Sequence, residues 1–532
     1  MLALRQNQRV FGCCSGGIAV MSAIVLPLLF GFAAFGIEVS GWYLTQRKMQ
    51  GSADAAVISA AAAYIAGDDY VSVGKTYASQ NGWTDGSNSV TVAITGFLTA
   101  SPPHIDADIS QAQTSMFSKF LPGVTAMPTL KAHASVTLVT NTANGTGCLI
   151  GLSHTASGGA IQISGQGNLN APSCIVASNT TTPTQPPNNC VNVSPPCITL
   201  SGGNAGMNIA ELDVATKAPF ACPSGPTCTV GKTQTFYPLW THDPYATLVM
   251  PTIPSCPGIN PATSGGGGVT VYSPGVYCQS GGISVTNNQY AVFKAGTYWL
   301  GGSNNATASS LAISGGSYVN LPLSTVASAT VSAQGTGYKN NDPLTVSGGT
   351  FTAPLNAATF KVASQSGGKI TAITFTNAGS YTVVPTNPVS VTGGSGTGAK
   401  LTLTLNPAPG AVTFISTGPS ASKVGTLSIN GGTVSLTAPS SGATNGLIFW
   451  QNKIGTSGAT LAGNPTSVTL NGALYFPNTQ VAISGSYSFQ PTNCTAIVAN
   501  VISFTGQGTI TKGCLPIGGG GGGGAIGWHI SQ

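Results

Sequence analysis

The sequence contains very few ionisable side chains. Asp, Glu, Lys and Arg together make up 5% of its 532 residues, against about 25% in ordinary soluble domains. Its three arginines, Arg5, Arg9 and Arg47, all lie near the N-terminus. Binding to a nucleic-acid backbone needs a basic patch or stripe, and the lysines beyond Arg47 are scattered singly. The composition therefore argues against nucleic acid as a partner.

Carboxylates are the scarcest groups in the C-terminal part. After Gly147 only Glu211, Asp213, Asp243 and Asp342 remain. Glycoside hydrolysis needs two carboxylates about 5 to 9.5 Å apart, and calcium sites need a cluster of oxygen ligands. Glu211 and Asp213 would share a face if they lay on a strand. They lie outside the clear β runs, however, and we expect a solvated loop pair.

A second candidate catalytic or sugar-binding segment is "LWTHDPYAT". It puts His242 beside Asp243 and close to Trp240 and Tyr245, which fits either an aromatic-lined sugar site or a structural loop corner. Neighbouring residues on a strand point in opposite directions, so the pair is weak as acid–base apparatus. No nucleophile elbow, HExxH, P-loop or dinucleotide fingerprint is present. We therefore predict no enzyme activity, no catalytic residue, no cofactor and no metal site.

Glycine, cysteine and apolar residues are what the chain has in abundance. It contains 72 Gly, 34 Pro and 12 Cys, and its mean hydropathy is +0.24. Low charge at this hydropathy favours a folded, β-rich, extracytoplasmic protein rather than a disordered one. An even set of cysteines in such a compartment predicts disulfides, and the alternative of zinc lacks CxxC spacing. We expect sequential pairing of Cys148, Cys174, Cys190, Cys197, Cys222, Cys228, Cys256, Cys278, Cys494 and Cys514.

The N-terminal part carries one long apolar run. Gly16 to Ile37 is 22 residues without a charge, which at about 1.5 Å per residue spans a hydrocarbon core of roughly 30 Å. Pro27 lies inside the run, and membrane helices tolerate such kinks. The alternative is a cleaved signal peptide, but its apolar region is shorter, about 7–15 residues. We favour a retained anchor, with the cysteine-rich part outside the cytoplasm.

The helical pattern continues beyond the apolar run. From Trp42 to Ala66 there is no proline, and only Gly51 interrupts good helix formers. Small residues recur three or four positions apart on one face, and such a face allows close approach of another element. This segment is either a simple stalk or the packing helix of a pilin-like subunit. The small residues are Ala53, Ala56, Ala60 and Ala63.

The N-terminal residues resemble a known family. The match consists of Gly17, Pro27, Glu38-Val39-Ser40, Tyr43, Arg47, Met49, Gln50, Ala53, Asp54, Ala55 and Ala56. These follow the pattern of TadG-like proteins of the Tad (Flp, tight-adherence) pilus system. Gly17, Pro27 and Glu38 take the anchor positions. Related pseudopilins carry Glu five residues after a cleavage glycine, and Val20, Met21 and Ser22 stand there here. The resemblance therefore does not extend to prepilin processing.

From Gly147 onward, short β runs alternate with Gly, Asn and Ser turns. Stacked rungs with inward Val, Ile and Leu would bury what one rung cannot. We predict a right-handed parallel β-helix-like solenoid, with a β-sandwich as the second choice. Segments such as "PGVYCQSGG", "VTFISTG" and "LNGALYFPNTQVAISG" resemble the C-terminal region of TadG-like proteins, in the same order.

The predicted organisation is mainly β with five parts. Residues 1–67 form the anchor and long helix, and residues 68–146 form a small α/β region. Residues 147–324 and 410–517 form the glycine-rich solenoid body, residues 325–409 an inserted β module, and residues 518–532 a flexible tail. Inserts in solenoids map to loops, often on the binding face, so we expect the insert to carry a partner-contacting surface.

The resemblance implies a single-pass inner-membrane protein with its body in the periplasm or outside the cell. It would serve pilus assembly and adherence by contact with pseudopilins and other Tad components, and with lipid through its helix. One alternative is an adhesin that binds surface glycans through the insert. A second is a carbohydrate-active β-helix enzyme.

Overall fold

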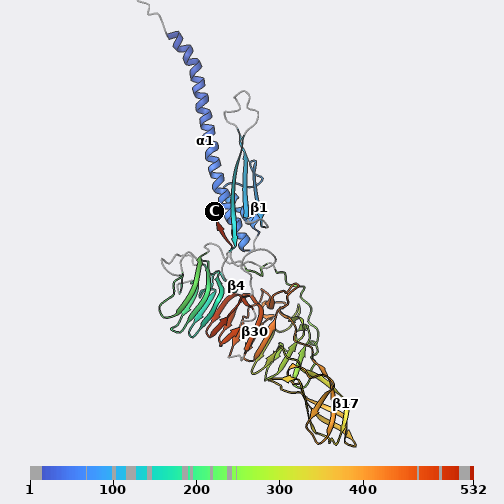
Figure 1. Ribbon diagram of the computed structural model, residues 1–532. Coiled ribbons are helices and arrows are strands. Elements are labelled where there is room, and N and C mark those ends of the chain that lie inside the picture. The colour runs from blue at the N-terminus through green and yellow to red at the C-terminus, as the bar shows by residue number, and fades with distance from the viewer. Residues whose placement is uncertain are drawn as a thin grey trace, which may run out of the picture. The chain divides into compact units, whose positions relative to one another are not determined.

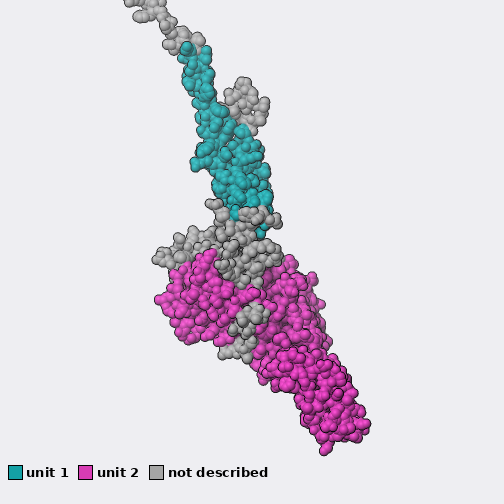
Figure 2. All heavy atoms as spheres, in the orientation of Figure 1, with its two compact units in different colours: residues 1–64, 68–139, 530–532 teal, residues 65–67, 140–529 magenta. Residues whose placement is uncertain are grey.

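The computed structural model describes residues 15–66, 69–98, 104–114, 128–140, 146–181, 190–191, 196–215, 220–235, 243–246, 248–463, 467–489, 494–513 and 528–531. The chain forms two compact units (Figures 1 and 2). Unit 1 comprises residues 1–64, 68–139 and 530–532, and unit 2 comprises residues 65–67 and 140–529.

Unit 1 combines two helices with a small sheet. Helix α1 (Ser15–Ala66) has 52 residues, and α2 (Tyr70–Gln80) follows it. The sheet order is β1-β2-β3-β34, and the β1–β2 and β2–β3 pairs are antiparallel. Its strands are β1 (Val90–Phe97), β2 (His104–Ala112), β3 (Thr129–Thr140) and β34 (Trp528–Ser531). The sequence did not predict a strand at β34, which lies in the tail expected to be flexible.

Local sequence explains these elements. Strand β1 alternates buried and exposed residues, with Val90, Val92 and Ile94 on the buried side, which is the pattern of a strand covered on one face. The Asp69 carboxylate caps α2 by accepting hydrogen bonds from the backbone N–H groups of Val71 (3.1 Å) and Ser72 (3.3 Å). Such a cap satisfies N–H groups that have no partner in the first turn.

Unit 2 is built on one sheet of 22 strands. Every pair of this sheet whose register is described is parallel, unlike the antiparallel sheets of a β-sandwich. The pairs arrange the strands in three columns, in which neighbours are hydrogen-bonded. Strand β30 (Ser467–Ile483) contributes to all three columns in succession.

Column A runs from β10 (Val269–Tyr272) to β9 (Thr227–Thr235). Between them lie β13 (Tyr290–Phe293), β16 (Tyr318–Val319), β27 (Thr433–Thr437), β30, β31 (Tyr487–Phe489), β33 (Gln507–Ile510), β6 (Asn168–Ser178) and β8 (Gly206–Val214).

Column B begins with β11 (Gly275–Tyr277). It continues through β14 (Gly296–Leu300), β25 (Val412–Ser416), β28 (Leu447–Gln451), β30, β32 (Thr495–Phe504) and β4 (Thr146–Gly151) to the second halves of β6, β8 and β9. A 3-10 turn, η2 (Ala421–Lys423), follows β25.

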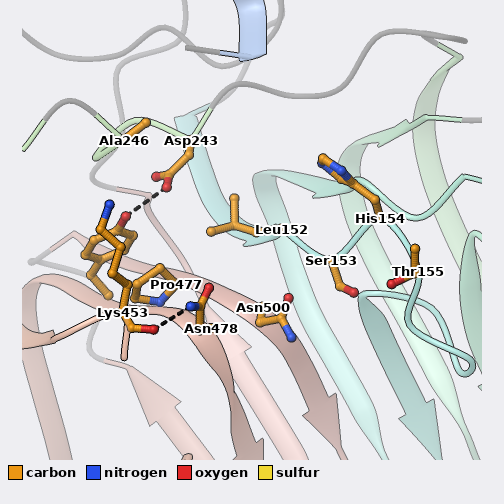
Figure 3. Close-up of a pocket in the computed structure, with 11 residues that line it drawn as sticks. Leu152, Ser153, His154, Thr155, Asp243, Ala246, Lys453, Pro477, Asn478 and Asn500 are labelled. Atoms are coloured by element: carbon orange, nitrogen blue, oxygen red, sulfur yellow. Dashed lines mark hydrogen bonds between the residues drawn. The ribbon is translucent and has the colours of Figure 1, made fainter. Parts of the chain in front are cut away.

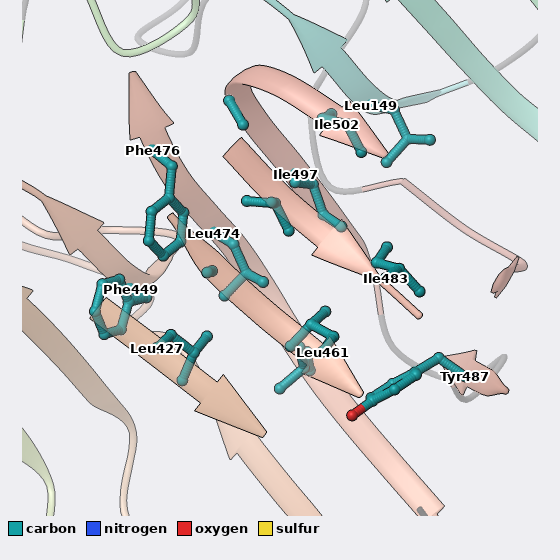
Figure 4. Packing of buried hydrophobic residues seen from close by; sticks show 14 of the residues in the cluster. Leu149, Leu427, Phe449, Leu461, Leu474, Phe476, Ile483, Tyr487, Ile497 and Ile502 are labelled. Atoms are coloured by element: carbon teal, nitrogen blue, oxygen red, sulfur yellow. The ribbon is translucent and has the colours of Figure 1, made fainter. Parts of the chain in front are cut away.

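Column C begins with β12 (Gly282–Val285). It continues through β15 (Ser309–Ser314), β26 (Val424–Asn430), β29 (Ala459–Ala462), β30 and β32 to β5 (Ile161–Ser164) and β7 (Ile198–Ser201). One hydrophobic core includes residues of all three columns, and Figure 4 shows part of it.

The order of strands in the sheet departs from the order in the sequence at one junction. Strand β32 pairs with β4, so that Ile497 lies beside Leu149, and β33 pairs with β6, so that Thr509 lies beside Asn170. In Figure 1 the strands around β30, in red, adjoin those around β4, in cyan and green. Strands from the end of the body sequence therefore join strands from its beginning, and β9 and β10 end the sheet.

The chain covers the outer face of column B with a crossing segment (residues 243–246 and 248–250). Side chains of the segment pack against buried residues that include Trp450 and Tyr475. The packing residues of the segment are Tyr245, Leu248 and Met250. The face they cover belongs to the strands of β28 and β30, whose alternate residues, such as Phe449 and Leu474, enter the main core.

Between β16 and β25 the chain forms a separate antiparallel module. Its six-stranded sheet has the order β17-β24-β23-β18-β20-β21, and β19 pairs with β22. It has its own hydrophobic core. The strands are β17 (Val326–Thr336), β18 (Pro343–Val346), β19 (Thr350–Phe351), β20 (Thr359–Ser366), β21 (Lys369–Asn377), β22 (Tyr381–Val383), β23 (Val389–Thr392) and β24 (Thr397–Leu405).

The module covers the β10 end of the body. Ala378 and the partly buried Phe375 pack with Val269 and Tyr290 in one apolar cluster. The backbone N–H of Ala378 also donates a hydrogen bond to the carbonyl of Gly267 (2.8 Å). This contact protects the apolar residues of the first strands from water, as capping elements do at the ends of repeat structures.

Candidate functional site

The first half of α1 exposes an apolar surface. It is the one described helix that is long and apolar enough to cross a membrane, by length and composition. Gly17 and Pro27 lie within the helix, and Glu38 is buried at 6% exposure. The exposed apolar residues are Met21, Ile24, Val25, Leu26, Leu28, Leu29, Phe30, Phe32, Phe35, Ile37, Val39 and Leu44. Such a surface suits lipid or another apolar helix rather than water.

The second half of α1 packs within unit 1. The four small residues of the predicted packing face, Ala53, Ala56, Ala60 and Ala63, are all buried. The Gln50 side chain donates a hydrogen bond to the carbonyl of His133 in β3 (2.8 Å), so this half of the helix lies against the sheet. A methyl-sized side chain is therefore what this face accommodates.

Helix α2 also approaches α1 closely. A Cβ atom placed on Gly74 of α2 would lie 3.1 Å from Cβ of Ala60 and 3.0 Å from Cγ1 of Ile94 in β1. Gly74 is thus held between α1 and the sheet, where a larger residue would push the elements apart.

Disulfides connect four of the sequential cysteine pairs. The pairs are Cys148–Cys174, Cys190–Cys197, Cys222–Cys228 and Cys256–Cys278, with Cα–Cα distances of 5.3 to 5.9 Å. Cys494 is also disulfide-bonded, whereas Cys514 lies outside the described residues. The prediction of disulfide-bonded cysteines is confirmed for these residues, and the first of the bonds links the adjoining strands β4 and β6 of column B.

Glu211 and Asp213 do not form a solvated loop pair. They lie two positions apart on β8, facing the same way, and are 3% and 1% exposed. Lys232 of β9 lies 3.8 Å from the Glu211 carboxylate. Burial, and then the adjacent Glu211 carboxylate, raise the pKa of Asp213 well above its usual range. The sequence pattern missed β8 because the acidic residues interrupt its apolar alternation.

Asp243 fixes the crossing segment to the body. The Tyr475 hydroxyl donates a hydrogen bond to Oδ2 of Asp243 (2.8 Å), and the backbone N–H of Tyr245 donates to Oδ1 (2.9 Å). The Tyr245 and Tyr475 rings lie 5.1 Å apart. Burial raises the pKa of both tyrosines, and the Asp243 charge adds to the rise. These contacts favour a structural corner at Asp243.

A hollow of about 510 Å³ opens beside this corner (Figure 3). Asp243 and Lys453 border it on one side and His154 on the other, and burial lowers the pKa of His154. His242 and Trp240 lie outside the described residues. Sequence reasoning missed Tyr475, since it stands 232 positions from Asp243 and no local pattern links the two.

The remaining acidic residue, Asp342, lies in a turn of the inserted module. Backbone N–H groups of Lys339 and Ser395 donate to its carboxylate (2.9 Å each), as does the Ser395 hydroxyl (2.7 Å). These hydrogen bonds lower the pKa of Asp342. Within the described ranges, no group of three or more His, Cys, Asp and Glu side chains could hold a metal ion.

Comparison with known proteins adds one match. Residues 16–63 match the model of the family described as putative Flp pilus-assembly TadE/G-like. The match begins in the first turn of α1 and ends in its packed, alanine-rich half. No curated protein and no solved structure matches the chain. The family prediction is confirmed for the N-terminal segment: the chain carries a TadE/G-like Flp pilus-assembly domain at residues 16–63.

Proposed function

We propose that the protein is a membrane-anchored, extracytoplasmic structural component of a Tad/Flp pilus assembly apparatus. The observation that carries this proposal is the family match at residues 16–63, because it covers both halves of α1. The exposed apolar half would insert in the inner membrane as a single span. The packed half would then hold the sheet of unit 1 close to the membrane surface, where pseudopilins and assembly proteins are met.

The disulfides support an extracytoplasmic location for the body. Four bonds lie in unit 2, and such bonds persist in oxidising compartments rather than in the cytoplasm. The chain would therefore have its N-terminus inside and its body in the periplasm or at the cell exterior.

We propose that the body is a right-handed parallel β-helix that acts by contact and not by catalysis. The three columns of parallel pairs support a solenoid. Two features support a contact role. The Asp213 carboxyl is buried with a raised pKa, and the Asp243 carboxylate is engaged by Tyr475 and Tyr245. A carbohydrate-active enzyme needs acid and base groups that reach a substrate.

One observation favours the adhesin alternative. The inserted module exposes the apolar side chains Phe351 (48%) and Val383 (61%) on its paired strands β19 and β22. Exposed apolar groups close together often belong to an interaction surface. On this alternative, a partner or surface ligand would contact β19 and β22.

The pilus-assembly proposal is tested in a bacterium that assembles Flp pili and encodes this protein. Deletion of the gene should abolish surface pili, and the full chain should restore them. A photo-crosslinking residue at Leu28 or Phe32 should capture membrane components of the pilus system, whereas the same residue at Thr460, on the body, should not. Normal piliation after the deletion would refute the proposal.

Two further experiments separate the alternatives. Replacement of Phe351 and Val383 by Ser should abolish surface adherence without loss of pili if the insert is an adhesin. An epitope placed after Gly524 should resist protease in intact cells and be digested in spheroplasts if the body is periplasmic. Digestion in intact cells would place it outside, and resistance in both would place it in the cytoplasm.

A further inference from the structure

The outer face of column A contains a hollow of about 320 Å³ where four strands lie side by side. The strands are β33, β6, β8 and β9. Amide and hydroxyl groups line the hollow, and none of the lining residues is charged. The residues whose polar side chains matter here are Asn168, Asn170, Asn208, Thr227, Thr229 and Thr509.

Strand register places these side chains in two rows. In the first row Thr509, Asn170, Asn208 and Thr229 are successive partners, one on each strand. In the second row, two residues earlier on each strand, Asn168 and Thr227 flank Gly206. Residues two positions apart point to the same face of a strand, and neighbouring strands are about 4.8 Å apart. The face is therefore a regular array of hydrogen-bonding groups.

In the second row, the side chains of Asn168 and Thr227 close over Gly206. A Cβ atom at this position would lie 2.9 Å from Nδ2 of Asn168 and 2.9 Å from Oγ1 of Thr227. Any larger residue would push these two side chains apart, and both of them line the hollow. The present shape of the hollow therefore depends on glycine at position 206.

One hydrogen bond orients the two amides of the first row relative to each other. Nδ2 of Asn208 donates a hydrogen bond to Oδ1 of Asn170 (2.8 Å). Each amide carries two N–H donors and an oxygen that accepts two bonds, and each threonine hydroxyl both donates and accepts. One bond between the two amides thus leaves donor and acceptor capacity of both kinds for a ligand in the hollow.

The chemistry of the face selects one class of ligand. Nucleic acids and acidic polysaccharides need Lys or Arg, which the hollow lacks, and apolar ligands need apolar walls. A ligand that both donates and accepts hydrogen bonds along its length and carries no charge matches the array. A polysaccharide of neutral sugars has these properties, and its hydroxyl groups recur at intervals comparable with the spacing of the strands.

We propose that this face of column A binds a neutral polysaccharide through Asn170, Asn208 and Thr229, with one sugar ring lying over the hollow that these residues line. The site differs from the insert surface and from the hollow beside Asp243, and it goes beyond the role in pilus assembly. It would let the body hold to cell-surface or matrix glycan whether or not pili are made. Its strands come from both ends of the body sequence, so the site exists only when β33 has joined β6.

The test uses the full chain in detergent and immobilised dextran, mannan and cellulose as neutral probes, with alginate as the acidic control. We expect binding to at least one neutral polysaccharide that changes little with ionic strength, and no binding to alginate. The double variant Asn170→Ala/Asn208→Ala should weaken binding at least about tenfold, the loss for about 1.4 kcal/mol, and Gly206→Val should abolish it.

A second site variant and a control variant complete the test. Thr229→Ala changes an exposed residue of the site on the terminal strand, and it should weaken binding while the protein keeps its protease resistance. Thr460→Ala is the control, because it changes an exposed residue on column C, and it should leave binding unchanged. Absence of binding to all three neutral probes would overturn the proposal. The proposal would also be overturned if the column A variants bound as well as the parent. It would be overturned too if Val383→Asp, a change in the insert, removed binding, since the binding site would then lie in the insert.

Discussion

At the scale of single residues, the few acidic side chains of unit 2 have different surroundings. Asp213 is buried beside Glu211, Asp243 accepts hydrogen bonds from two partners, and Asp342 lies in an exposed turn. Burial of a carboxyl favours its neutral form, whereas hydrogen bonds to the carboxylate favour the charged form. These carboxyls should therefore respond to pH in opposite ways.

Asp213→Asn should reduce the change in stability between acid and neutral pH. The folded protein holds the Asp213 proton more tightly than the unfolded chain does, because the pKa of this carboxyl is raised on folding. Its contribution to stability is then full below the usual pKa of 3.8 and is lost as the pH rises from that value through the raised pKa of the folded protein. We expect the melting temperature of the parent to fall relative to that of Asp213→Asn between acid and neutral pH.

Asp342→Asn serves as the contrasting variant. Hydrogen bonds lower the pKa of Asp342, so its contribution to stability is present above the usual pKa and is lost in acid. The melting temperature of the parent should therefore rise relative to that of Asp342→Asn between acid and neutral pH. If both variants shifted the pH profile in the same direction, the burial of Asp213 would be contradicted.

Tyr475→Phe should loosen the crossing segment. The variant removes the hydroxyl that donates to Asp243 but keeps the ring against Tyr245. A hydrogen bond to a charged group contributes about 1.5–3 kcal/mol, and we expect a loss of this size in the free energy of unfolding of unit 2. Urea unfolding measures it, with Tyr318→Phe as the control, and an equal loss in the control would contradict the role of the bond.

At the scale of elements, α1 joins two environments in one helix. Its first half exposes large apolar residues, and its second half presents small residues to β3 and α2. Alanine on a packed face lets the neighbouring elements approach closely, so the size of the side chain matters more there than its polarity.

Ala60→Leu should disrupt unit 1. Ala60 is fully buried and lies against Gly74 of α2, so a larger side chain costs about 1–3 kcal/mol through overpacking. Amide hydrogen exchange in β1 and α2 should become faster. Gly51→Ala is the matched control, because nothing lies within 4 Å of a Cβ atom there. It should stabilise the helix by up to about 1 kcal/mol, and equal effects of the two variants would contradict the packing.

At the scale of the whole chain, unit 2 depends on contacts between residues far apart in sequence. The strands β4 to β9 adjoin β32 and β33, although more than 200 residues separate β9 from β32. At this junction the apolar residues of β4 and β32 cover each other, because Leu149 and Ile497 are paired neighbours in the same core (Figure 4).

A chain ended after Phe489 should therefore lose order far from the cut. Without β32 and β33, strands β4, β5 and β6 lack partners on one side and their apolar residues face water. Hydrogen exchange in β4–β6 should rise to that of an unfolded chain, while a chain ended at residue 517, which retains Cys494 and Cys514, stays protected. Full protection of β4–β6 in the shorter chain would contradict the junction.

Much of the architecture could be predicted from local signals. The apolar run with Pro27, the alanine face of α1 and the alternating runs of the body each identify an element from its neighbours in sequence, because helix and strand periodicity are local properties. The cysteine pairs close short loops and could be paired in order. The family resemblance came from residues of the same N-terminal segment, between Gly17 and Ala56.

The sites could not be predicted in the same way. The partnership of Tyr475 with Asp243, the burial of Asp213 and the rows that join Thr509 to Asn170 all depend on strand register between distant segments. By itself the sequence determined which segments are helical, which are β-strands and that the N-terminal helix has an apolar surface, since these features follow from side-chain chemistry over a few residues. Only the tertiary structure decided which strands become neighbours, because that choice depends on how the whole core is closed.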